Sequence, residues 1–128
     1  MDAPILRVVP QRHESDCGVA VLAMLFGVTY EEALIALSWE IPTVLTSGAY
    51  TSHLKQAAKN LGSSLKVRRV FDMDDATGIL CVSSVRWKTD HVVILKDGLL
   101  FDTDGTVWDA DVYFKVHHAK AGALLVRS

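Results

Sequence analysis

The sequence predicts an α+β fold, with helices in the first half of the chain and an antiparallel sheet in the second. Residues 17–26 are apolar on nearly every side, as in a helix that is buried on all faces. After residue 62 the apolar residues begin to alternate with polar ones, which is typical of half-buried strands. Residues 91–102 then hold two apolar segments joined by Asp97-Gly98, the favoured dipeptide of a two-residue hairpin turn.

The length and composition fit one folded domain over residues 1–128. Half of the residues are apolar and 22% are charged, the net charge is -2, and no long basic run occurs, so we expect no nucleic-acid partner. No apolar run is long enough to span a bilayer, and residues 1–12 lack the features of a secretory signal. We therefore expect a cytoplasmic protein with no membrane partner, in which both cysteines remain thiols.

Local signals place the elements of the first half. Ser15 or Asp16 can cap the helix over 17–26, and Gly27 suits its C-terminal end. Thr29 followed by Glu32 is a capping-box pattern, which predicts the start of a second helix. The other elements expected here are a strand over 5–9, that second helix over 30–38, a loop over 41–52 and a helix over 53–62.

The second half predicts strands over 64–71, 78–87, 91–102 and 122–128. A two-residue turn at Asp97-Gly98 would set Leu95 opposite Leu100. Continued along the hairpin, this register sets Val93 opposite Asp102 and His91 opposite Asp104.

Cys17 stands where a polar, turn-prone segment becomes the apolar helix. Thiolate is the reactive form of cysteine, and the N–H groups and dipole of a helix N-terminus favour a negative charge. Gly18 removes bulk beside the sulfur, so we expect it to let a substrate carbonyl approach. The alternative is that Cys17 is an inert, buried small residue.

A thiol nucleophile needs a general base, and His91 is the candidate because it opens a strand directly after a polar loop. Asp102 and Asp104 project from the same face as His91 in the predicted register, so either carboxylate could orient the ring. Gln11, six residues before Cys17, is the candidate donor for a developing oxyanion.

Trp87, four residues before His91, either packs in the core or walls a substrate groove. Cys81 lies in an apolar strand and is expected to be a core residue. No cysteine and histidine spacing of a structural zinc site occurs, so we expect no metal ion and no cofactor.

The segment "QRHESDCGVAVLAML" (11–25) resembles the active-site segment of papain-like cysteine peptidases. Within that superfamily it is most similar to the bacteriocin-processing peptidases, which occur as domains on ABC exporters and cleave leader peptides after a double glycine. The resemblance continues in "TSGAYTSHLKQAAKNLG" (46–62) and "DHVVILKDGLLFD" (90–102), in the same order. It implies a papain-like fold, in which the nucleophile starts a buried helix that packs on a C-terminal antiparallel sheet.

The resemblance also implies a role for each matching residue. Gln11 would be the oxyanion donor, Cys17 the nucleophile, His91 the base and Asp102 the group that orients the base. The family's acid is usually followed by proline, whereas Thr103 follows here, and the short hairpin leaves the neighbouring carboxylate as a rival. No exporter segment is among these residues, so the family's substrate is not carried over.

These residues predict a cysteine peptidase that cleaves a peptide or isopeptide bond in a peptide or protein substrate. A variant of the same chemistry would transfer the acyl group to another acceptor or deamidate glutamine. A cell-wall amidase of the NlpC type is an alternative, although its third polar residue is commonly a histidine. A second alternative is a peptide- or protein-binding module of the same fold without turnover.

Overall fold

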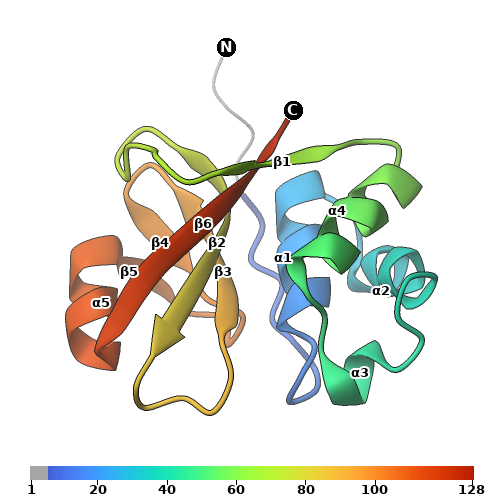
Figure 1. Cartoon of the computed structure of the whole chain (residues 1–128), viewed down its shortest axis with the longest axis horizontal. Helices are drawn as coiled ribbons and strands as arrows, with labels where there is room; N and C mark the ends of the chain where they lie inside the picture. Colours follow the sequence, from blue (N-terminus) through green and yellow to red (C-terminus); the bar gives the residue numbers. More distant parts are fainter. Residues whose placement is uncertain (1–5) are drawn as a thin grey trace.

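The computed structural model describes residues 6–128, which form a mixed helix and antiparallel-sheet structure (Figure 1). The six strands are ordered β1-β6-β2-β3-β4-β5, and every neighbouring pair is antiparallel. Figure 1 shows α1 to α4 gathered on one side of the sheet and α5 on the other. The α+β class predicted from the sequence is thus observed.

The helices are α1 (Cys17–Phe26), α2 (Tyr30–Ser38), α3 (Val44–Ser47), α4 (Thr51–Asn60) and α5 (Ala110–His117). The strands are β1 (Leu65–Arg68), β2 (Thr77–Ser84), β3 (His91–Lys96), β4 (Leu99–Phe101), β5 (Val107–Asp109) and β6 (Ala119–Arg127).

The two helices predicted most directly begin and end where their local signals indicate. α1 is buried along almost its whole length and ends at Gly27, whose φ of 65° is left-handed. At the start of α2 the Thr29 hydroxyl accepts a hydrogen bond from the backbone N–H of Glu32 (3.1 Å), and the Glu32 carboxylate accepts one from the Thr29 N–H (3.1 Å). The capping box is confirmed.

The β3–β4 hairpin also follows its sequence signal. Asp97 and Gly98 both have positive φ, 52° and 78°, as a type I′ turn requires. Leu95 pairs with Leu100 as predicted, but the ladder ends at the pair of Ile94 and Phe101. The expected pairing of Asp102 and Asp104 with β3 is therefore wrong, because β4 stops one residue before Asp102.

The sheet separates two apolar layers, because successive side chains of a strand point to opposite faces. Ile79, Ile94 and Leu125 pack with α1, α2 and α4, whereas Leu80, Val93 and Leu124 pack with α5. α1 lies against β3 and β2. This packing brings the first residue of α1 beside the first residue of β3.

Several expected boundaries differ. Residues 6–9 form no strand, and position 5 lies outside the described residues. The predicted loop over 41–52 contains α3 and the start of α4, and the strands expected over 64–71 and 78–87 end earlier. β5 and α5 were not predicted, and β6 starts at Ala119 instead of residue 122.

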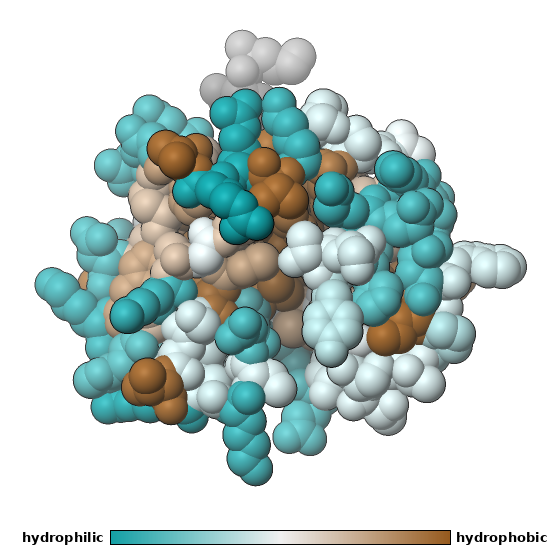
Figure 2. Space-filling view, viewed as in Figure 1, coloured by the Kyte–Doolittle hydropathy of each residue, from teal (hydrophilic) through white to brown (hydrophobic). Residues whose placement is uncertain are grey.

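No single helix within residues 6–128 is long and apolar enough to cross a membrane; α1 and α2 reach the length only as a pair bent by 118°. The face in Figure 2 shows hydrophobic side chains as small groups among hydrophilic ones.

Candidate functional site

A groove of about 910 Å³ runs along the end of the molecule where α1 and β3 begin. Its walls come from five segments that are far apart in the sequence. They are the segment before α1, the loop between α3 and α4, the loop between β2 and β3, the turn after β4, and α5. The lining includes Gln11, Cys17, Trp87, His91, Asp102 and Thr103.

Cys17 is the first residue of α1 and is partly exposed. The residue before it, Asp16, stands at the N-cap, but its side chain makes no hydrogen bond to α1, so the expected side-chain cap is wrong. Its carboxylate instead accepts hydrogen bonds from the backbone N–H groups of Arg12 (3.1 Å) and His13 (3.0 Å) and from the Tyr30 hydroxyl. Asp16 is fully buried, and these bonds hold the chain that leads into Cys17.

His91 lies between Cys17 and Asp102. Its Nε2 is 2.8 Å from Oδ1 of Asp102, and the two side chains are only 24% and 10% exposed. The ring also forms a hydrogen bond with the Cys17 side chain. The Asp102 carboxylate occupies Nε2, which leaves Nδ1 as the ring nitrogen available to the thiol.

The electrostatics of the three groups favour a charged ring. Burial lowers the pKa of His91, but the hydrogen bonds to Asp102 and Cys17 and the negative charges of both partners raise it to about 9. Burial raises the pKa of the Asp102 carboxyl, yet its hydrogen bond and attraction to His91 bring that pKa below its ordinary value. The Asp102 carboxylate therefore stabilises the charged form of the His91 ring.

Of the two rival carboxylates, the structure brings Asp102 to the ring. Oδ1 of Asp102 also accepts the backbone N–H of Thr103 (2.7 Å). Asp104 is exposed and accepts hydrogen bonds from the backbone N–H (2.9 Å) and the hydroxyl of Thr106. The carboxylate of Asp104 stabilises the turn after β4 and has no contact with His91.

Tyr113 of α5 lines the groove together with Asp102. Its hydroxyl helps to lower the pKa of Asp102, and burial raises the pKa of Tyr113 itself. The Tyr113 Oη is buried without a hydrogen bond of normal geometry to any described residue. Tyr113 therefore lies close to the acid and is buried with it.

Gln11 lines the groove with Cys17, but its amide is engaged by its own segment. Nε2 donates to the backbone oxygens of His13 (2.6 Å) and Glu14 (3.2 Å), and Oε1 accepts the hydroxyl of Thr103. Both amide hydrogens thus point at the backbone just before Cys17. To serve an oxyanion, the hydrogen of the longer bond to Glu14 must turn toward the substrate.

The structure corrects the role expected for Gly18. This residue is buried, and a Cβ there would lie 3.1 Å from Leu54 Cδ2 and 3.5 Å from Leu37 Cδ2. Gly18 therefore lets α4 and α2 pack closely on α1, and it lies on the side of α1 that faces the core instead of the groove.

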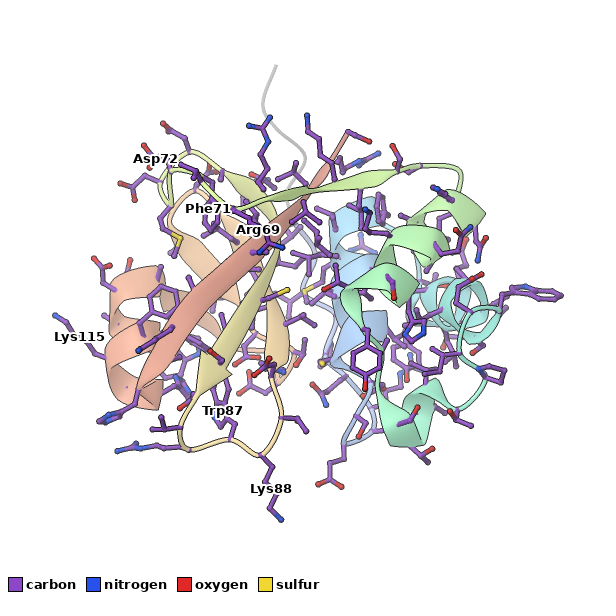
Figure 3. All side chains as sticks on the ribbon, in the orientation of Figure 1. Arg69, Phe71, Asp72, Trp87, Lys88 and Lys115 are labelled. Carbon is purple, nitrogen blue, oxygen red and sulfur yellow. The ribbon has the colours of Figure 1, made fainter. Side chains whose placement is uncertain are left out.

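Trp87 lines the groove and also packs against the buried cluster beside α5, so both of its sequence interpretations apply. Its ring meets that of His91 edge to face, with centroids 5.8 Å apart and planes at 76°. Figure 3 shows Trp87 against the body of the protein, while the neighbouring Lys88 extends away from it. Trp87 thus forms one wall beside the imidazole.

Tyr113, His117 and Thr103 were not assigned to the site from the sequence. The first two share one face of α5 at a spacing of four residues, and Nδ1 of His117 lies 3.0 Å from the Tyr113 backbone oxygen. The apolar spacing in "ADVYFKVH", preceded by Asp109, was the available signal for this helix. The sequence singled out Thr103 only because the resembled peptidases usually have proline after the acid.

Within the described part of the chain, no three His, Cys, Asp or Glu side chains are grouped to hold a metal ion. No protein-family model matches this sequence, and no curated protein sequence matches it.

Proposed function

We propose that this protein is a papain-like cysteine peptidase that cleaves a peptide or isopeptide bond, with Cys17 as nucleophile, His91 as general acid and base, and Asp102 as the group that orients His91. The observation that carries the proposal is that one imidazole contacts both other groups at the mouth of a single groove. The order of residues also matches the active-site segments that the sequence resembles.

The first half of the reaction forms a thioester. The Cys17 thiolate attacks the carbonyl carbon, and the carbonyl electron pair moves to oxygen. The backbone N–H of Cys17, which has no partner within α1, and the Gln11 amide donate hydrogen bonds to that oxygen. As the tetrahedral intermediate collapses, the C–N bond breaks and Nδ1 of His91 gives its proton to the leaving amine.

The second half releases the acyl group. A water molecule attacks the thioester, and neutral His91 accepts its proton, so that the acid leaves and the thiolate–imidazolium pair forms again. Asp102 keeps Nε2 of His91 protonated and Nδ1 directed at the sulfur throughout. Transfer to an amine instead of water would use the same groups.

The rims of the groove suit an extended peptide. Trp87 stands beside His91 on one side, and Tyr50, 77% exposed, stands on the loop between α3 and α4. Aromatic side chains offer large contact area at low cost in side-chain entropy. A peptide or protein substrate would cross Cys17 between these two residues.

The partner of His91 favours a peptidase over an amidase of the NlpC type. The group at Nε2 is the carboxylate of Asp102, where those amidases commonly have a histidine. His117 lies in the groove, but its Nδ1 faces the backbone oxygen of Tyr113.

The test is alkylation by iodoacetamide at about pH 6, where an ordinary thiol with a pKa near 8.5 reacts slowly. We expect carboxamidomethylation at Cys17, located by mass spectrometry of peptides, and we expect His91→Ala to abolish it. Cys81 is the internal control, because burial raises the pKa of its thiol. Equal labelling of Cys17 and Cys81 would contradict the proposal. It would favour the alternative of a binding module with the same fold and no turnover.

A further inference from the structure

Thr103 occupies a central position between the groups of the site and is one of the residues that line the groove. It is only 1% exposed. Its backbone N–H donates to Asp102 Oδ1 (2.7 Å), and its backbone oxygen accepts the N–H of Gln11 (2.7 Å). Its hydroxyl donates to Gln11 Oε1 and lies 3.4 Å from Nε2 of His91. One residue thus joins the segment before α1 to the acid and the imidazole.

The hydroxyl contact determines which way the Gln11 amide faces. A hydroxyl carries one hydrogen, and an amide oxygen only accepts hydrogen bonds. With Oε1 held by Thr103, the N–H groups of the amide are directed at the backbone just before Cys17. Without that donor, the partly buried Oε1 would lose its partner, and only the N–H bonds to His13 and Glu14 would hold the amide.

We propose that Thr103 is a positioning residue, whose hydroxyl fixes the Gln11 amide oxygen so that the N–H in the longer bond to Glu14 is the one that can turn toward the carbonyl oxygen that Cys17 attacks. The proposal rests on the thiol acyl-transfer function proposed above. The peptidases that the sequence resembles usually have proline here, which has neither an N–H nor a hydroxyl. A chain with proline at this position could therefore make neither contact.

The test compares Thr103→Val, which keeps the shape and the N–H but lacks the hydroxyl, with Thr103→Ser, which keeps both. The probe is p-nitrophenyl acetate, whose acetyl group passes to the thiolate as p-nitrophenolate leaves. Loss of an oxyanion donor costs about 10²–10³ in rate, so its misplacement in Thr103→Val should cost about tenfold. Thr103→Ser should stay within about threefold of the wild type, and an equal loss in both variants would overturn the proposal.

Iodoacetamide separates positioning of the oxyanion donor from other effects. Alkylation displaces iodide from a methylene carbon, so it needs the thiolate but forms no oxyanion. Thr103→Val should therefore alkylate Cys17 at the wild-type rate while its acylation falls. If both rates fall together, Thr103 acts through His91 or through the fold, and the proposal is wrong. Equal alkylation of Cys17 and Cys81 in the wild type would instead overturn the thiol function itself.

A double-mutant cycle with Gln11→Ala tests the assigned route. If Thr103 acts through the Gln11 amide, Thr103→Val should change acylation less than about twofold when Gln11 is already alanine. If the losses in acylation rate of the two single variants multiply in the double variant, Thr103 does not act through the Gln11 amide. Thr106→Val is the matched control, because its hydroxyl belongs to the same turn but is exposed and bonds to Asp104. It should acylate at the wild-type rate, and a loss equal to that of Thr103→Val would also overturn the proposal.

Discussion

Nε2 of His91 lies 2.8 Å from Oδ1 of Asp102, and this contact leaves Nδ1 as the ring nitrogen available to Cys17. A neutral imidazole carries one N–H, and a carboxylate only accepts hydrogen bonds, so Asp102 keeps the proton on Nε2. In the proposed mechanism, Nδ1 is then the nitrogen that would exchange its proton with the sulfur or the substrate. The proposed acid and base would therefore be oriented before any substrate binds.

The two carboxylates near the hairpin are expected to differ sharply in effect. Asp102→Ala should lower turnover of p-nitrophenyl acetate by about 10²–10⁴, because it removes the group that orients the base. Asp104→Ala should stay within about threefold of the wild type, since its carboxylate bonds only within the turn. Steady-state rates, with circular dichroism to verify folding, decide the question. A larger loss of turnover in Asp104→Ala than in Asp102→Ala would show that Asp104, and not Asp102, orients the base.

Stability should depend on pH through the same pair. The pKa of His91 is raised from its ordinary 6.5 to about 9, so its contribution is full below pH 6.5 and is lost as pH rises through 9. The pKa of Asp102 is lowered from 3.8, so its contribution is present above that pH and is lost as pH falls through the lower folded value. The contribution of the pair is therefore greatest between the two ordinary values.

The measurement is urea unfolding of the wild type and His91→Gln across this pH range. The difference in unfolding free energy between them should shrink from pH 6.5 to pH 9. A difference that stays constant, or grows with pH, would show that His91 is not stabilised as a cation.

The buried carboxylate of Asp16 should matter for both stability and reactivity. Asp16→Ala leaves two backbone N–H groups and the Tyr30 hydroxyl without their acceptor, so we expect a loss of about 2–4 kcal/mol in unfolding free energy. Alkylation of Cys17 should also slow, because the segment that precedes it is released.

The matched control is Glu31→Ala. It removes a 2.8 Å ion pair with Arg12 whose side chains are 55% and 62% exposed. We expect a change below about 1 kcal/mol, since exposed pairs contribute little. If the two variants had equal effects, Asp16 would not be the group that holds this segment.

The sequence predicted those parts of the fold that short segments determine. The uniform apolarity of α1, the capping box of Thr29 and Glu32, and the turn at Asp97-Gly98 each follow from residues within about ten positions. Cys17, His91 and Asp102 were all named from their places at the ends of these elements, and the structure brings them together.

The remaining features depend on contacts between distant residues. The register beyond Phe101 failed because the Asp102 N–H bonds to the Thr106 oxygen (2.9 Å), which turns the chain away from β3. Gln11 is oriented by a residue 92 positions later, which no local pattern indicates. The packing role of Gly18 could not be predicted, because its contact with Leu54 of α4 is likewise a tertiary one.

The most direct test of the central claim is the pKa of the His91 ring in the wild type and in Cys17→Ala, measured by NMR titration of the imidazole signals and assigned with His91→Gln. We predict a pKa of about 9 in the wild type and a lower value in Cys17→Ala, because the hydrogen bond and the charge of the thiolate both raise it. A wild-type pKa near 6.5, or the same value in both proteins, would contradict a thiolate–imidazolium pair between Cys17 and His91.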